Sequence, residues 1–121
     1  MAAHILAVDD SATMRDMVRD TLETGGYEVT LAEHGQEGVD KFAAGKFDLI
    51  IADINMPVMD GITMIREIRK LNSDVPIITL TTEAEESMKQ KGREAGADGW
   101  IVKPFRPAQF LDIIKQILED M

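Results

Sequence analysis

Four short apolar runs, and one segment at residues 27–32 in which polar and apolar residues alternate, are separated along the chain by longer segments in which apolar residues recur every three or four positions. Short runs bounded by turn residues are typical of strands, and a spacing of i, i+3, i+4 and i+7 is typical of helices. The expected strands cover residues 5–8, 27–32, 47–52, 77–80 and 100–102. Strands that alternate with helices form parallel sheets joined by right-handed crossovers. The pattern therefore predicts an α/β fold with a five-stranded parallel sheet, in which a strand–helix unit, (βα), occurs five times.

The segments between the strands carry the signals of helix ends. We expect helices over residues 12–24, 36–44, 61–71 and 84–95, and a last helix from 107 onward. Asp10 or Ser11 can cap the first helix. The third helix should bury one apolar face, which consists of Ile62, Ile65, Ile68 and Leu71. The fourth contains Gly92 in its interior, which costs about 1 kcal/mol relative to alanine.

Composition narrows the class of protein. The chain has 121 residues, 45% hydrophobic and 29% charged, which is enough for one domain with a real core. We expect a single domain over residues 1–121 without an output domain, and no membrane segment, because no apolar run approaches about 20 residues. Without cysteine there is no disulfide or zinc–thiolate site. A net charge of −9 disfavours nucleic acid as a partner, and the first residues lack signal-peptide regions, so we expect a cytoplasmic protein.

Polar residues follow four of the five expected strands directly. Asp9 and Asp10 follow the first, Asp53 follows the third, Thr81 follows the fourth and Lys103 follows the fifth. In an open parallel sheet all these strand ends lie along one edge, which is where ligands bind. The acids, the hydroxyl and the lysine should therefore converge on one site.

These residues occur in motifs that resemble those of response-regulator receiver domains, and within that family most closely the single-domain chemotaxis regulators. The motifs are Asp9-Asp10, the segment 53–61 (Asp-Ile-Asn-Met-Pro-Val-Met-Asp-Gly), Thr81 and Lys103-Pro104-Phe105. The likeness extends over almost the whole chain. It implies a doubly wound, flavodoxin-like sheet in the strand order 2-1-3-4-5. It also implies a cis peptide bond between Lys103 and Pro104.

The implied strand order brings three carboxylates together. Asp9 and Asp10 then lie beside Asp53, Thr81 lies on its other side, and the long side chain of Lys103 reaches back from two strands away. Three close carboxylates repel one another, and Lys103 offsets only one charge. Oxygen ligands without His or Cys favour Mg²⁺ or Mn²⁺ over zinc. By resemblance, Asp10, Asp53 and the backbone carbonyl of Asn55 bind Mg²⁺ directly, and Asp9 acts through water.

The resemblance implies a signalling switch and not an enzyme with an external substrate. Asp53 would accept a phosphoryl group from a sensor histidine kinase of the chemotaxis (CheA-like) type, or from a small phosphodonor. Lys103 and the metal would neutralise the phosphoryl oxygens, and the same site would later dephosphorylate itself.

The resemblance also implies how the signal leaves the site. Thr81 would move toward the phosphoryl group, and the aromatic residue of the last strand, here Trp100, would rotate into the vacated space. Family members of the chemotaxis type usually carry tyrosine there, whereas an indole can donate but not accept a hydrogen bond. Asn55 and Thr82 would tune the lifetime of the phosphorylated state. From the residues alone, Asn55 can equally be a turn residue and Thr82 an exposed side chain.

Several partners and functions remain open at this point. In a chemotaxis setting the target would be a flagellar motor switch protein, with a phosphatase as a further partner, and the chain would act as a monomer. A phosphate sink or phosphorelay receiver would carry the same site without binding the motor. An aspartyl-phosphate hydrolase of the haloacid-dehalogenase type would need a second acid two residues after Asp53, where this chain has Asn55.

Overall fold

The computed structural model describes residues 2–119. In this range the strands are β1 (His4–Val8), β2 (Glu28–Ala32), β3 (Leu49–Ala52), β4 (Ile77–Thr81) and β5 (Gly99–Val102). The helices are α1 (Ala12–Thr24), α2 (Gly35–Ala44), α3 (Gly61–Leu71), α4 (Glu86–Ala95) and α5 (Pro107–Glu119). All strand pairs are parallel, and the sheet order is β2-β1-β3-β4-β5. The expected (βα)5 fold and strand order are confirmed.

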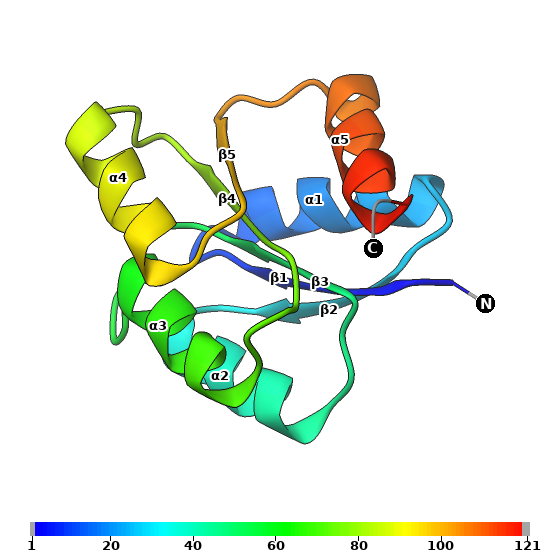
Figure 1. Ribbon diagram of the computed structural model, residues 1–121. Helices are drawn as coiled ribbons and strands as arrows, with labels where there is room; N and C mark the ends of the chain where they lie inside the picture. Colours follow the sequence, from blue (N-terminus) through cyan, green and yellow to red (C-terminus); the bar gives the residue numbers. More distant parts are fainter. Residues whose placement is uncertain (1, 120–121) are drawn as a thin grey trace.

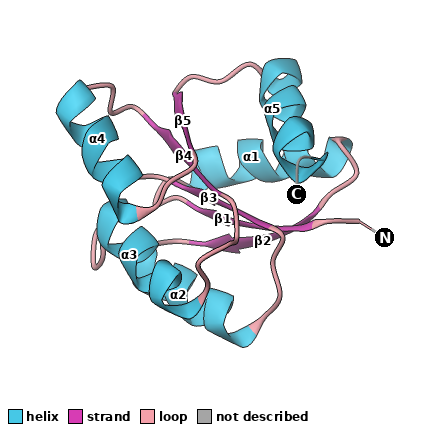
Figure 2. Ribbon diagram, in the orientation of Figure 1, coloured by secondary structure: helices cyan, strands magenta, loops and turns pink. Residues whose placement is uncertain are grey.

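Helices cover both faces of the sheet (Figure 1). Figure 2 shows α1 and α5 on one face and α2, α3 and α4 on the other. Successive side chains of a strand point to opposite faces, so each strand supplies both cores. In β1, Ile5 and Ala7 pack in the core beneath α1 and α5, while Leu6 and Val8 pack beneath α2, α3 and α4. This explains why β1, β3 and β4 are apolar nearly throughout, since neither of their faces meets water.

Side chains cap the beginnings of three helices. The Ser11 hydroxyl accepts a hydrogen bond from Met14 N, and the Asp60 carboxylate accepts one from Thr63 N. His34 caps α2 through Nδ1, which accepts from Glu37 N at 3.2 Å. Each of these acceptors satisfies a backbone N–H that has no partner within its helix. Between Asp10 and Ser11, the structure assigns the cap of α1 to Ser11.

Two expectations about helices were wrong. The fourth helix begins at Glu86 and not at residue 84, because Glu83 makes other contacts: its N–H donates to the Thr81 hydroxyl and its carbonyl accepts from the Trp100 indole. Leu71 is 56% exposed and not part of the buried face of α3, of which it is the last residue.

None of the helices in residues 2–119 combines the length and the apolar character needed to cross a bilayer. The expected single domain also included residues 1, 120 and 121, which lie outside the described residues.

Candidate functional site

Strand register brings the acids of β1 and β3 side by side. Val8 pairs with Ala52, so Asp9 and Asp53 follow neighbouring positions, and Asp53 N donates to Val8 O at 2.9 Å. One carboxylate oxygen each of Asp9, Asp10 and Asp53 lies within 4.8 Å of the others. Asp9 and Asp53 are buried, at 5% and 7% exposure, whereas Asp10 is exposed. The site is therefore an acidic pocket that opens to solvent on the Asp10 side.

Lys103 reaches this pocket from the end of β5. Its Nζ lies 2.8 Å from Asp9 Oδ2 and 3.2 Å from Asp53 Oδ2. The backbone N of Lys103 donates to the Thr81 carbonyl at 2.8 Å, and the peptide bond to Pro104 is cis. Its side chain is only 11% exposed. Lys103 thus bridges the two buried acids, as the reach of a long side chain across two strands predicts.

Backbone N–H groups orient the two buried carboxylates. Asp53 Oδ1 accepts from Ile54 N at 2.7 Å, and Asp9 Oδ1 accepts from Ser11 N at 2.9 Å. The other oxygen of each acid is then the one that faces Lys103. Arg15, which we did not predict from the sequence, donates from Nη1 to the Asp9 carbonyl at 2.7 Å and so holds the end of β1.

The charges of the pocket do not balance. Burial raises the pKa of Asp9; hydrogen bonds from Lys103 and Ser11 lower it without cancelling this effect, and the charge of Asp53 raises it further. Burial lowers the pKa of Lys103, but its hydrogen bond to Asp9 and the charges of Asp53 and Asp9 outweigh burial, so this pKa lies above its usual value. Lys103 therefore stays protonated at neutral pH, and three carboxylates share one cation.

The donor set of the pocket fits a hard divalent cation. Its ligand atoms are carboxylate oxygens, with no His or Cys in the cluster. Mg²⁺ and Mn²⁺ prefer such ligands, and a divalent ion would offset the charge that Lys103 leaves uncompensated. The cluster is thus compatible with Mg²⁺ binding.

Thr81 and Trp100 meet at the loop between β4 and α4. Thr81 is fully buried, and its hydroxyl accepts from Glu83 N at 3.2 Å. Trp100 Nε1 donates to the Glu83 carbonyl at 2.8 Å. Both polar groups of the Glu83 backbone are therefore held by the two residues that the resemblance names as the switch.

Gly92 explains how an indole fits at position 100. A Cβ at Gly92 would lie 2.6 Å from Cζ3 of Trp100, which is closer than real atoms approach. The ring thus packs directly on the backbone of α4. From the sequence alone, Gly92 is only a residue that weakens its helix, and its contact with Trp100 becomes visible in the structure.

The two remaining predicted residues lie in the loops after β3 and β4. Asn55 is exposed, as is Thr82 after β4. Gly61 N donates to the Ile54 carbonyl at 2.8 Å, which closes the loop against α3. Val58 lies at the tip with φ of 67° and is 78% exposed, a backbone conformation that β-branched residues rarely adopt.

The charge imbalance leads to a prediction for Asp9→Asn. Burial raises the pKa of Asp9 in the folded protein above its value in the unfolded chain. The wild type therefore has its full stability below the pKa of the unfolded chain and loses part of it as the pH rises through the pKa of the folded protein, where a buried carboxyl must ionise. Without metal at neutral pH, Asp9→Asn should raise the free energy of unfolding by about 1 kcal/mol. The gain should vanish below the unfolded pKa and shrink when Mg²⁺ is added. Urea unfolding in EDTA and in Mg²⁺ measures both effects.

Asp112→Asn, at an exposed position of α5, is the matched control and should change little under either condition. An Asp9→Asn protein that is less stable than the wild type in EDTA would show that the ion pair with Lys103 outweighs the repulsion among the acids.

Comparison with known proteins assigns the family. The model for the response regulator receiver domain matches residues 5–115. The chain is 41% identical over 119 residues to chemotaxis protein CheY of Bacillus subtilis (strain 168), covering 98% of this chain and 99% of that protein. It is 42% identical over 114 residues to transcriptional regulatory protein ResD of the same organism, covering 94% of this chain but only 47% of ResD.

A solved structure supports the same assignment. Chemotaxis protein CheY4 of Vibrio cholerae is 43% identical, with a TM-score of 0.93 and coverage of 97% of this chain and 99% of that one. The relatives thus include both chemotaxis proteins and a transcriptional regulator, and what they have in common is the domain that this chain matches. From this match over residues 5–115 we conclude that the chain belongs to the response regulator receiver domain family.

Proposed function

We propose that this protein is a Mg²⁺-dependent phosphoacceptor switch of a two-component system and that Asp53 accepts the phosphoryl group. Receiver domains are signalling switches that histidine kinases phosphorylate and that bind target proteins. One observation carries the assignment to Asp53: it is the acid at the end of β3 that joins the carboxylate cluster and contacts Lys103 at 3.2 Å.

The metal would be held by the acids of the pocket. We assign Asp10, Asp53 and the backbone carbonyl of Asn55 as direct ligands and Asp9 as a ligand through water, with Mn²⁺ able to replace Mg²⁺. When bound, the ion supplies positive charge that stabilises the phosphoryl oxygens during transfer. The acidic cluster of Asp9, Asp10 and Asp53 supports this assignment.

The transfer itself is a displacement at phosphorus. A carboxylate oxygen of Asp53 forms a bond to phosphorus, while the bond from phosphorus to the imidazole nitrogen of the kinase, or to the carboxylate of an acyl phosphate, breaks. Lys103 Nζ, which already lies next to both buried acids, turns toward a phosphoryl oxygen and neutralises it. Water later attacks the phosphorus of the acyl phosphate, which returns Asp53 and releases inorganic phosphate.

Thr81 and Trp100 would carry the signal away from the site. A phosphoryl oxygen offers the Thr81 hydroxyl a new acceptor, and Thr81 then gives up its present bond with Glu83 N. Because Trp100 holds the carbonyl of the same Glu83, movement of this loop changes the indole contact and the face formed by α4, β5 and α5. Asn55 and Thr82, which are exposed and lie shortly after Asp53 and Thr81 in the sequence, would set how fast water reaches the phosphoryl group.

We propose chemotaxis as the setting, with a CheA-like kinase as donor and a flagellar motor switch protein as target. The nearly full-length likeness to CheY of Bacillus subtilis supports this. A phosphate sink or phosphorelay receiver without motor binding is the alternative, because the equally high likeness to ResD, a transcriptional regulator, shows that this domain also occurs outside chemotaxis proteins. Binding of the phosphorylated protein to motor switch components would separate the two.

Trp100, the single tryptophan of the chain, offers a direct test. Mg²⁺ should change its fluorescence, and beryllofluoride added with Mg²⁺ should change it further, because Glu83 links the indole to Thr81. Lys103→Ala should keep most of the Mg²⁺ response and lose most of the beryllofluoride response, since Lys103 acts on the phosphoryl group and not on the metal.

Two results would contradict this proposal. Loss of the Mg²⁺ response in Lys103→Ala would mean that Lys103 has been assigned the wrong role. Turnover of an ordinary phosphomonoester such as p-nitrophenyl phosphate would point to a hydrolase instead of a switch.

A further inference from the structure

The two ends of α4 are held very differently. Its buried residues, Gly92 and Ala95, both lie in the C-terminal half. At the N-terminal end, the cap residue Glu85 makes no side-chain hydrogen bond to the helix. Burial alone therefore makes the C-terminal half the better anchored one.

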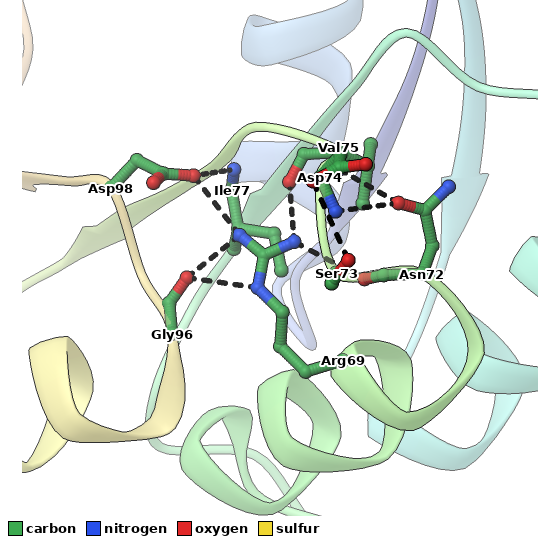
Figure 3. Close-up of polar contacts among 8 residues, drawn as sticks. All are labelled: Arg69, Asn72, Ser73, Asp74, Val75, Ile77, Gly96 and Asp98. Atoms are coloured by element: carbon green, nitrogen blue, oxygen red, sulfur yellow. Dashed lines mark hydrogen bonds and ion pairs between the residues drawn. The ribbon is translucent and has the colours of Figure 1, made fainter.

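Arg69 on α3 binds the C-terminal end of α4, and we call this set of contacts the clamp (Figure 3). Its Nε and Nη2 both donate to the Gly96 carbonyl, at 3.1 and 2.7 Å. Nη2 also pairs with Asp98 Oδ2 at 3.0 Å, and Nη1 donates to the Val75 carbonyl at 2.6 Å. One guanidinium thus joins α3, the start of β4 and the turn between α4 and β5.

The partners of Arg69 are themselves fixed. Asp98 Oδ2 also accepts from Ile77 N at 2.9 Å, and Asp98 N donates to the Ile77 carbonyl at 2.7 Å. Gly96 has φ of +120°, and a Cβ there would lie 2.7 Å from Arg69 Nε, so the close approach requires glycine. The guanidinium of arginine is planar, always charged and carries several N–H donors, so it can contact all these acceptors at once. The single ammonium group of a lysine could not.

The N-terminal end of α4 lies toward the acidic pocket. The chain passes from Thr81 through Glu83 to the first turn of the helix, and Met88 N and Lys89 N both donate to the Glu85 carbonyl. A rearrangement at Thr81 or Glu83 therefore reaches α4 at the end that lacks a cap. The clamped end is at the opposite edge of the sheet, where β4 and β5 begin.

We propose that Arg69 is the fulcrum of α4: the helix turns about the end held at Gly96, and its N-terminal end makes the movement. Arg69 is in this view a positioning residue, which converts a change near Thr81 into rotation of the helix without touching the pocket. The part of this proposal that concerns activation rests on the proposed function, whereas the clamp itself does not.

Amide hydrogen exchange of the metal-free protein tests the clamp. The amides from Arg93 to Ala97 should exchange at least about tenfold more slowly than those of Gln90 and Lys91, because the clamped end opens less often. Arg69→Gln should reduce this ratio to less than about threefold. Asp98→Asn, a milder change that removes only the ion pair, should reduce it part of the way.

Arg66→Gln is the matched control, since Arg66 lies exposed on the same helix and its replacement removes the same charge. It should leave the ratio unchanged. A wild type that shows no difference between these two groups of amides, or an Arg69→Gln protein that keeps the full difference, would contradict the proposal that Arg69 is the fulcrum.

A second arm addresses activation. With Mg²⁺ and beryllofluoride, amide chemical shifts should change more over residues 86–90 than over 96–98 in the wild type, and Arg69→Gln should spread the changes to both ends. Equal chemical-shift changes at both ends of α4 in the wild type would contradict the proposal that Arg69 is the fulcrum. No change anywhere would instead contradict the proposed function, and the exchange ratio would still decide whether Arg69 clamps the helix.

Discussion

Asp53→Asn should abolish phosphorylation while leaving the fold intact. An amide nitrogen or oxygen does not form a stable acyl phosphate, so the loss should be at least about a thousandfold, the scale seen when an enzyme loses its nucleophile. The variant keeps an oxygen that can accept from Ile54 N, as Asp53 Oδ1 does at 2.7 Å. It also removes one of three close carboxylates, which should not lower the free energy of unfolding of the metal-free protein.

The measurement is intact mass after incubation with acetyl phosphate and Mg²⁺, together with the Trp100 fluorescence response to beryllofluoride. Asp40→Asn, at an exposed position on α2, is the control and should be labelled like the wild type. Equal labelling of Asp53→Asn would place the phosphoacceptor on another residue and remove the basis of the proposed function.

Gly61→Ala should destabilise the protein by about 3 kcal/mol. A Cβ at this position would lie 2.1 Å from the Asp53 carbonyl oxygen and 2.8 Å from Ile54 Cα. Both are backbone atoms, which cannot move aside as a flexible side chain would. The added methyl group must therefore push α3 away from the end of β3, and the Asp53 side chain should lose its position next to Lys103.

Urea unfolding compares this variant with Gly99→Ala. At Gly99 a Cβ would make ordinary contacts of 3.6 and 3.7 Å with the Ile78 side chain, so this control should change stability by less than about 1 kcal/mol. If Gly61→Ala were as stable as Gly99→Ala, the tight packing of α3 on Asp53 and Ile54 would be wrong. A stable Gly61→Ala protein that binds Mg²⁺ normally would also show that the loop does not position the acids.

Much of the architecture follows from local sequence patterns. A strand needs only a short apolar run and a helix only a 3.6-residue period, and both are visible without knowledge of the fold. Because parallel strands place their ends on one edge, the residues after them were expected to meet, and Asp9, Asp53 and Lys103 do so at 2.8 and 3.2 Å. The order of the strands did not come from these patterns but from the likeness to a known family.

The contacts that required the tertiary structure join segments far apart in sequence. No local signal makes Arg69 the partner of Gly96 and Asp98, or shows that Gly92 leaves room for the ring of Trp100. Val58, a β-branched residue at positive φ, adopts a backbone conformation that its local preference disfavours. The sequence by itself thus determined which elements form and which side chains lie at the edge of the sheet, since both depend on neighbours along the chain. Only the tertiary structure decided how α4 is held and how Trp100 is seated, because those depend on distances between elements.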